Sequence, residues 1–395
     1  MSPHASLTSS GYGRVLRPLW RLAPDMTFLN HGSYGACPRA VLAVQRHWHD
    51  RMEEQPVRFM QSVLPDALRE AAAVLARFLG AEPADLVFVE NATSGVNAVL
   101  RSLELEPGDE LLTTNHVYPA IRNAVREIAR RQGAIAVEAE VPFPLEGPEQ
   151  VVEAITRTLS SRTRVVIVDA VTSPTAVVLP LAEIVTRCRA AGTKVLVDAA
   201  HAPGMIPLDL ASLGADWVTG NLHKWLFAPK GCAFLWARRD AQAGLHPLAI
   251  SHGLGQGFAA EFDWTGTRDP SAWLSAPAAL AFWLALGGND LMTRNRKLAE
   301  EAARLLAASW STEIGAPATM RGAMATVALP LAGTADRDAA TAIHDRLWAR
   351  HKIEVPVVAF AGRLWVRISA QAYNEIDDYA RLAAAISLEA RCIGR

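Results

Sequence analysis

Short apolar runs alternate with amphipathic stretches through the middle of the chain. The apolar runs are almost continuously hydrophobic, which is typical of strands buried on both faces of a mainly parallel sheet. Several of the segments between them, such as 119–133 and 180–192, carry apolar residues at helical spacing. Alternating strands and helices predict an α/β fold with a mainly parallel seven-stranded sheet. The expected strands lie at 86–90, 110–113, 134–139, 164–171, 193–199, 215–219 and 232–237.

The last third of the chain has a different pattern, which predicts a smaller α+β domain. It opens with a stretch rich in Ala and Leu and mostly helical in spacing, at 270–310. We expect a strand at 324–329, a helix at 336–351, strands near 353–358 and 363–369, and a closing helix at 375–391. The predicted parts are an N-terminal arm and helix at 1–60, a large α/β domain at 61–270 and a small domain at 271–395.

Composition narrows the class of protein. The chain has 395 residues, 50% of them hydrophobic, and a net charge of -1, which suits a globular protein with a sizeable core. The balanced charge gives no indication of the excess of basic residues that binding to nucleic acid or an anionic membrane requires. No apolar run reaches the roughly 18 residues that span a bilayer, and no apolar signal segment opens the chain. Four scattered cysteines without a C-x-x-C pair predict reduced thiols, a cytoplasmic location and no metal site.

Polar residues follow the expected strands at four places. They are the segments 91–94, 115–116, 198–201 and 221–224. Because ligands of open α/β sheets bind outside the carboxyl ends of the strands, these residues are the first candidates for a site.

Two of these candidates carry charge beside apolar sequence. Lys224 precedes Trp225, Leu226 and Phe227, and an apolar setting lowers the pKa of an amine and makes it nucleophilic. Taken alone, its sequence favours a lysine whose stem lies along the core edge, and Lys230 is a nearby competitor for the catalytic role. Asp198 ends an apolar run, where a carboxylate needs a partner such as a pyridinium nitrogen. Its ordinary alternative is a turn or helix cap.

Two further candidates complete a constellation. Thr93 and Ser94 follow a strand and open a helix, which is a ready phosphate site, or simply an N-cap. His116, just past the strand at 110–113, has a ring that can stack on a planar cofactor, or is a surface or hydrogen-bonded histidine. Each signal is weak alone. Together they supply a phosphate donor, a ring platform, a pyridinium partner and an amine at consecutive strand ends.

The chain resembles the class V, fold type I, family of pyridoxal 5′-phosphate (PLP) enzymes, and within it the isopenicillin N epimerase-like proteins. The resemblance runs from about Phe28 to about Leu382. It rests on FLNHGSYGACPRAVL at 28–42, NATSGVNAVL at 91–100, VDAAHAPG at 197–204, TGNLHKWLFAPKGCAFLW at 219–236, WTGTRDPSAW at 264–273 and RISAQAYNEIDD at 367–378.

The resemblance implies a role for each matching residue. Lys224 forms the aldimine with PLP and later acts as acid and base at Cα, while Asp198 pairs with the pyridine nitrogen. His201 lies near the ring hydroxyl and His116 stacks on the ring. The phosphate is held by Thr93, Ser94, Asn221 and His223, and by Gly266 and Thr267 donated from a neighbouring subunit, which implies a homodimer. The substrate is bound by Arg367, through its carboxylate, and by Asn30, His31, Gly32 and Ser33.

Two departures from the family pattern bear on the reaction. Ser173 stands where cysteine desulfurases have an Asn, so the contact to the ring oxygen is altered. The stretch from His351 to Val366 contains no cysteine, which disfavours a persulfide-forming desulfurase. Arg58 is open to two interpretations, a contact to a second acidic group of the substrate or a surface ion pair.

The reaction type follows from the number of proton donors. Elimination at Cβ needs only the base Lys224, whereas epimerisation needs a donor on the opposite ring face, for which Tyr118 is the one candidate. We therefore expect a β-eliminating lyase of the C–S lyase type acting on an α-amino acid, with an epimerase or aminotransferase as alternatives. A catalytically inactive binding module is disfavoured by the pair Asp198 and Lys224. The G-x-G-x-G string at 253–257 lacks a preceding strand, so a nucleotide loop is not expected.

Overall fold

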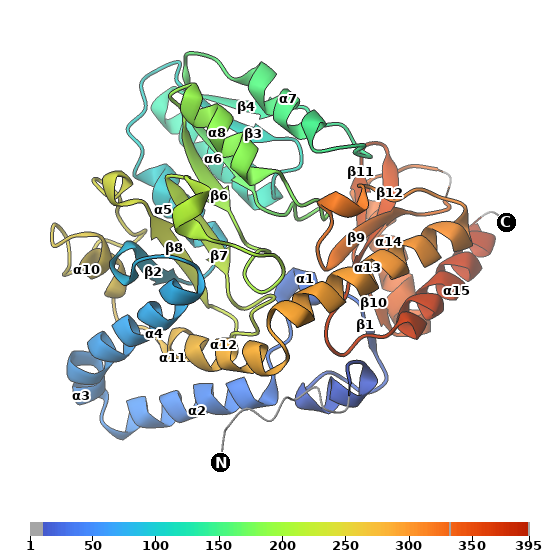
Figure 1. The fold of residues 1–395 in the computed structure, drawn as a ribbon, viewed down its shortest axis with the longest axis horizontal. Coiled ribbons are helices and arrows are strands. Elements are labelled where there is room, and N and C mark those ends of the chain that lie inside the picture. The colour runs from blue at the N-terminus through green and yellow to red at the C-terminus, as the bar shows by residue number, and fades with distance from the viewer. Residues whose placement is uncertain (1–10, 332, 394–395) are drawn as a thin grey trace.

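A seven-stranded sheet forms the centre of the larger part of the molecule (Figure 1), in a computed structural model that describes residues 11–331 and 333–393. Across the sheet the strands are β2 (Leu86–Val89), β8 (Ala233–Ala237), β7 (Trp217–Asn221), β6 (Lys194–Asp198), β5 (Thr163–Asp169), β3 (Glu110–Thr114) and β4 (Ile135–Ala139). Only β8 runs antiparallel to its neighbours. The predicted mainly parallel α/β sheet is confirmed.

Alternate residues of the strands face two separate helical layers. Val165 and Ile167 of β5 belong to a core shared with α5 (Ala92–Arg101) and α6 (Pro119–Gln132). Val166 and Val168 belong to the opposite core, shared with α7 (Glu149–Thr158) and α8 (Leu181–Ala190). Because both faces are covered, the strands need apolar residues at every position, which explains their continuous hydrophobicity. The edge strand β4 departs from this pattern and exposes Ile135.

The C-terminal part has its own antiparallel sheet and core. Its strands, in the order β11 (Val357–Phe360), β12 (Arg363–Ser369) and β9 (Met324–Ala328), are packed by α13 (Asn289–Trp310), α14 (Arg337–His351) and α15 (Ile376–Ile393). The expected single strand near 353–358 is two short ones, β10 (Ile353–Glu354) and β11, separated by Pro356. Proline has no N–H to continue a ladder, which accounts for the break. The predicted boundaries at 60 and 270 stay a prediction.

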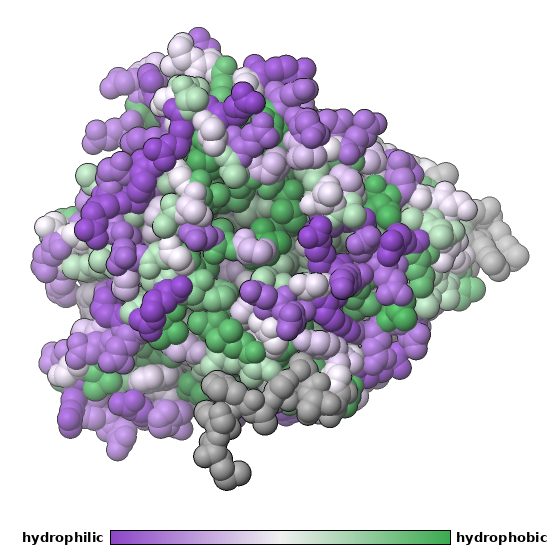
Figure 2. Space-filling model, viewed as in Figure 1, coloured by the Kyte–Doolittle hydropathy of each residue, from purple (hydrophilic) through white to green (hydrophobic). Residues whose placement is uncertain are grey.

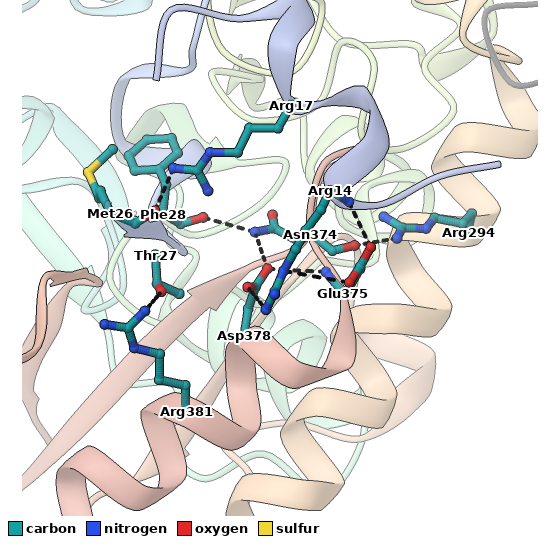
Figure 3. Close-up of polar contacts among 10 residues, drawn as sticks. All are labelled: Arg14, Arg17, Met26, Thr27, Phe28, Arg294, Asn374, Glu375, Asp378 and Arg381. Carbon is teal, nitrogen blue, oxygen red and sulfur yellow. Dashed lines mark hydrogen bonds and ion pairs between the residues drawn. The ribbon is translucent and has the colours of Figure 1, made fainter. Parts of the chain in front are cut away.

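The N-terminal arm reaches across to the C-terminal part and is held there. Strand β1 (Thr27–Phe28) pairs in parallel with β10. Figure 3 shows Arg14 against the start of α15, where its backbone N–H donates to Glu375 at 2.7 Å, and shows Asn374 donating to the carbonyl of Phe28 at 3.0 Å. After β1 the chain passes through α1 (His31–Tyr34), α2 (Arg39–Glu54), α3 (Pro56–Arg58) and α4 (Leu64–Phe78). Both ends of the chain are therefore tied together near β10 and α15.

The long helices are the remaining feature of the fold. In the described ranges no single helix is long and apolar enough to cross a membrane; Ser271–Ala285 and Asn289–Trp310 pass that test only as a pair, which bends by 69°. Figure 2 shows hydrophobic residues gathered at the middle of one face, with polar residues around them.

Candidate active site

A cavity of about 480 Å³ lies outside the carboxyl ends of the central strands. This is where the topology of an open α/β sheet places ligands. It brings together eight of the residues predicted from sequence: Ser33, Thr93, Ser173, Asp198, His201, Asn221, His223 and Lys224. Its other lining residues are Tyr34, Glu90, Asn91, Ala92, Tyr118, Asp169, Ala200 and Gly231.

The amine of Lys224 points into this cavity and lies 3.2 Å from Nε2 of His201. Burial, helped by the nearby Arg367 cation, lowers the pKa of the Lys224 amine to about 8. The indole N–H of Trp225 donates to Nδ1 of His201 at 3.4 Å. Since Nδ1 accepts, the hydrogen of a neutral His201 ring sits on Nε2 and points at a neutral Lys224 amine. Burial lowers the pKa of His201 well below its usual value, which keeps the ring neutral.

Two carboxyl groups lie side by side at the strand ends. Asp198 ends β6 and Asp169 ends β5, and the two are register partners. Asp198 accepts a hydrogen bond from the backbone of Ala200 at 2.9 Å. Burial raises the pKa of both carboxyls, and for Asp169 the neighbouring Asp198 raises it further. A cationic ring nitrogen placed beside them is the partner that would favour their ionised form.

The start of α5 forms the end of the cavity that was predicted to hold a phosphate. The side chain of Asn91 accepts from the N–H of Ser94 at 2.9 Å, and Asn221 accepts from the N–H of Ala92 at 2.8 Å. The N–H of Thr93, as in any first helical turn, has no partner within the helix. Gly95 permits this arrangement, because a Cβ there would lie 2.1 Å from Oγ1 of Thr219 on β7. Asn221 thus anchors the helix to the sheet while the Thr93 amide and hydroxyl face the cavity.

His223 lines the same end of the cavity, with Nδ1 3.0 Å from the carbonyl of Cys232. A carbonyl only accepts, so the ring hydrogen is on Nδ1. Burial lowers the pKa of His223 to about 4, which leaves Nε2 without a hydrogen near neutral pH. A bound phosphate would raise that pKa and turn Nε2 into a donor.

Arg367 is a buried cation behind the cavity. Its guanidinium donates to the carbonyl of Ser173 and, at 2.8 Å, to the hydroxyl of Ser33. Burial lowers its pKa to about 10, so it stays charged at neutral pH. Within the described ranges it has no carboxylate partner, and its Nε has no hydrogen bond. A buried arginine of this kind is suited to an anion supplied from outside the protein.

Of the predicted segment Asn30 to Ser33, only Ser33 lines the cavity. Asn30 donates to Glu354 at 2.7 Å. His31 is fully buried, with Nδ1 2.7 Å from the hydroxyl of Tyr373 and Nε2 2.9 Å from the carbonyl of Lys224. Gly32 is covered too, since a Cβ there would meet Met324 at 2.4 Å.

These contacts give the segment a supporting role. Burial lowers the pKa of His31 to about 3, so the ring is neutral and holds the backbone that carries Lys224. Gly35 has φ +67°, and a Cβ there would lie 2.2 Å from the carbonyl of His223. The arm therefore packs directly beneath the 223–224 backbone.

The structure differs most from expectation at His116. Its ring is 1% exposed, is not part of the cavity lining, and packs 4.6 Å from the ring of Phe360. Both nitrogens are engaged, Nδ1 with Thr175 at 2.7 Å and Nε2 with the carbonyl of Val141 at 3.2 Å. Tyr118, two residues on, lines the cavity and is 41% exposed. The stacking role predicted for His116 therefore stays a prediction, and Tyr118 is the nearby aromatic side chain that lines the cavity.

Five other residues from the sequence analysis lie outside the cavity. Ser94 lines a neighbouring cavity instead. Gly266 and Thr267 occupy the loop between α10 (Phe258–Asp263) and α11 (Ser271–Leu274). The amine of Lys230 donates to the carbonyl of Gly35 at 2.9 Å, which removes it as a competitor of Lys224. Arg58 is exposed and makes no ion pair with the described part of the chain.

The sequence analysis missed four cavity residues, which are Tyr34, Glu90, Asp169 and Gly231. Asp169 ends an apolar strand as Asp198 does, so the same signal pointed to it. Tyr34 gave no signal, because a single aromatic residue after a glycine-rich turn has many explanations.

Comparison with known proteins identifies the family. The family model for aminotransferase class-V matches residues 29–382. The chain belongs to the aminotransferase class-V family.

Relatives within the class-V family carry two kinds of name. A probable chloroplastic L-cysteine desulfhydrase of Arabidopsis thaliana is 35% identical over 92% of this chain and 83% of its own. Isopenicillin N epimerase of Amycolatopsis lactamdurans is 35% identical over 92% of this chain and 95% of its own. Among solved structures, a cystine C–S lyase in complex with cysteine persulfide matches with a TM-score of 0.77 at 21% identity, covering 92% of this chain and 98% of that one. A cysteine desulfurase of Thermococcus onnurineus matches with a TM-score of 0.80 at 17% identity, covering 96% and 98%.

These findings confirm three predictions: the fold, the cofactor PLP and an enzyme of the class-V family whose reaction is that of a lyase, an epimerase or a related type. The cavity fits PLP on its own chemistry. It offers a buried amine, paired carboxyls and a helix N-terminus to a group that carries an aldehyde, a pyridine nitrogen and a phosphate. One relative's name places that protein in the chloroplast, so the cytoplasmic location of this chain stays a prediction.

Proposed function

We propose that this class-V enzyme eliminates a sulfur leaving group from Cβ of an α-amino acid. For cysteine, the Cα–H and Cβ–S bonds break, and water converts the remaining fragment to pyruvate and ammonia with release of hydrogen sulfide. The observation that carries the proposal is a single amine, Lys224, facing the cavity from beside two strand-end carboxyls. Relatives named L-cysteine desulfhydrase support the same reaction.

The residues proposed to hold PLP divide between its two ends. Asp198 takes the pyridine nitrogen, Lys224 the aldehyde carbon, and the phosphate lies at the start of α5 with Thr93 and His223. When bound, PLP withdraws the electron pair left at Cα. Ser94 and Asn221 act through the helix that they fix.

Lys224 is proposed to move the proton at Cα. A base works best when its pKa lies near the working pH, and burial brings that of Lys224 to about 8. His201 orients the amine through the 3.2 Å contact, and His31 fixes the backbone below it. Elimination needs no second base, so this one group suffices.

Arg367 is proposed to bind the substrate carboxylate. It is buried and charged, its hydrogen bonds go to neutral oxygens of Ser33 and Ser173, and its Nε is unused. An incoming carboxylate would supply the missing negative charge and align Cα with the Lys224 amine.

The three cysteines whose side chains the structure describes argue against transfer of sulfur to them. Cys37, Cys188 and Cys232 are buried outside the cavity, and burial raises their thiol pKa values, to about 12 for Cys37 and about 11 for Cys188. Only the thiolate attacks sulfur, and these three thiols stay protonated at neutral pH. The sulfur is therefore proposed to leave as a free thiol or sulfide.

Epimerisation at Cα is the second candidate, because the phenol of Tyr118 lines the cavity and is accessible. A proton donor facing Lys224 across Cα would return the proton to the opposite side. The relatives named isopenicillin N epimerase support this alternative.

We also propose a homodimer that completes the cavity. Tyr34 and Tyr118 line it yet are 74% and 41% exposed, as expected where a second chain covers them. Leu248, also exposed, shares a neighbouring cavity with Glu90 of the site. The loop with Gly266 and Thr267 is proposed to enter the partner's site. Sedimentation of Thr267→Arg tests this, since an unchanged dimer with full PLP occupancy would reject the placement.

One assay separates the candidate reactions. L-Cysteine, its S-conjugates and a panel of amino acids are incubated with the PLP-loaded enzyme in D₂O, and pyruvate, ammonia, sulfide and enantiomers are measured together. We expect pyruvate, ammonia and thiol in equal amounts, in both the wild type and Tyr118→Phe. An inverted, deuterated substrate that depends on Tyr118 would establish epimerisation instead. Tyr34→Phe is the matched control for loss of a cavity phenol.

A further inference from the structure

The cavity contains a second buried acid, Asp169, which has not been given a role in holding PLP. Asp169 is 3% exposed and lines the same cavity as Asp198. Its Oδ2 is shielded from solvent and has no hydrogen-bond partner in the described parts of the chain. An unpartnered buried carboxyl oxygen is costly, so a group that completes it is expected to bind there.

The position of Asp169 identifies that group. Asp169 and Asp198 are register partners in adjacent parallel strands, which lie about 4.8 Å apart, so their side chains project from the same face. The phosphate end is farther along the sheet, at α5 and β7. Asp169 therefore lies at the end of the cavity where Asp198 meets the ring nitrogen.

We propose that Asp169 is a second acidic residue of the cofactor site, which together with Asp198 keeps the pyridine nitrogen protonated. This inference rests on the proposed placement of PLP against Asp198. One carboxylate compensates the charge of the protonated ring nitrogen. A second carboxylate raises the pKa of that nitrogen further, because its deprotonation would leave both carboxylates without a positive partner.

The charges around Asp169 agree with this role. Burial and then Asp198 raise its pKa well above the usual value, while Lys224 and the backbone amide of Tyr118 act in the opposite direction. Without the cofactor, the protonated form of Asp169 is thus favoured more strongly than in an ordinary carboxyl. A ring cation beside it is the charge that would favour its ionised form.

The test follows the ring nitrogen directly. PLP labelled with ¹⁵N in the ring is bound to the wild type, Asp169→Asn and Asp198→Asn, and the nitrogen shift is recorded from pH 6 to pH 10. We expect the nitrogen to lose its proton about 1 to 3 pH units lower in Asp169→Asn than in the wild type. We expect at least as large a change in Asp198→Asn.

The two failures are distinguishable. A nitrogen that changes in Asp198→Asn but titrates in Asp169→Asn as in the wild type would overturn the role of Asp169 alone. Unchanged titration in both variants would also overturn the placement of PLP. Asp169→Leu guards against a folding defect, because removing an unpartnered acid from a buried site should leave the melting temperature of the cofactor-free protein unchanged or higher. A lower melting temperature with an unchanged nitrogen would make Asp169 a structural residue.

Discussion

The ionisation of Lys224 is the property of this site that is most open to direct measurement. Burial lowers the pKa of its amine to about 8, and the Arg367 cation contributes to that lowering. We therefore predict that Arg367→Gln, which removes the cation but keeps a polar side chain, raises the Lys224 pKa in the cofactor-free protein. Arg367→Lys is the matched control, because it retains the charge and should leave the pKa close to that of the wild type.

The size of the effect follows from the two pKa values. At pH 7 an amine with a pKa of about 8 is roughly one-tenth neutral, whereas an ordinary lysine at about 10.4 is neutral in only about 4 molecules in 10,000. Burial therefore raises the reactive fraction of Lys224 by about 200-fold. Loss of one neighbouring positive charge should raise the pKa by roughly one unit, and so lower the neutral fraction at pH 7 about tenfold.

The composition of the chain makes the assay simple. There are five lysines, Lys194, Lys224, Lys230, Lys297 and Lys352, so a protein labelled with ¹³C at lysine Cε gives five resonances. The Lys224 signal is the one that is missing from the spectrum of Lys224→Arg. Its chemical shift in the wild type is then followed against pH. A midpoint near 10 in the wild type, or the same midpoint in Arg367→Gln and Arg367→Lys, would refute the reasoning.

Three further predictions follow from the site. Lys224→Met should abolish turnover yet stabilise the cofactor-free protein at pH 7 by up to about 3 kcal/mol. The cost of burying the charged amine is in full force below pH 8 and disappears as the pH rises past 10.5. Urea unfolding should therefore show most of the gain at pH 7 and less than about 1 kcal/mol of it at pH 10. Gly35→Ala should lower stability by about 1–3 kcal/mol, since its φ is +67° and the new Cβ meets the carbonyl of His223 at 2.2 Å; an unchanged melting temperature would contradict this. Tyr118→Ala should weaken PLP binding more than His116→Ala does, whereas His116→Ala should lower the melting temperature more, as measured by PLP titration and thermal unfolding. The opposite ranking would assign the stacking role to His116.

Much of this site was predictable because strand ends are visible in sequence. Continuous apolar runs located the strands to within a few residues, and parallel pairing then brings their carboxyl ends together. Asp198 and Lys224 needed no more than this. The family resemblance added Asn221, His223 and Arg367. The burial of Arg367 among neutral oxygens cannot be seen in the sequence pattern alone.

Two features were beyond sequence reasoning for physical reasons. His116 and Tyr118 are two residues apart, and only the turn between β3 and α6 decides which ring enters the cavity and which packs against Phe360. Asp169 gave the same signal as Asp198, but a carboxyl at a strand end has many satisfied alternatives. Its missing partner becomes visible only when every neighbour is placed.

The order in which the chain is synthesised has a consequence for this architecture. The arm that carries Ser33 and Gly35 is translated before the large domain, whereas its anchors, β10, Asn374 and the start of α15, are translated after it. The large domain has its strands long before then, and domains generally fold as they emerge. A chain that stops short of α15 would thus contain Lys224 without the arm fixed beneath it. The cofactor site is therefore complete only after the start of α15 has been made, and products truncated before α15 should be cleaved readily by proteases.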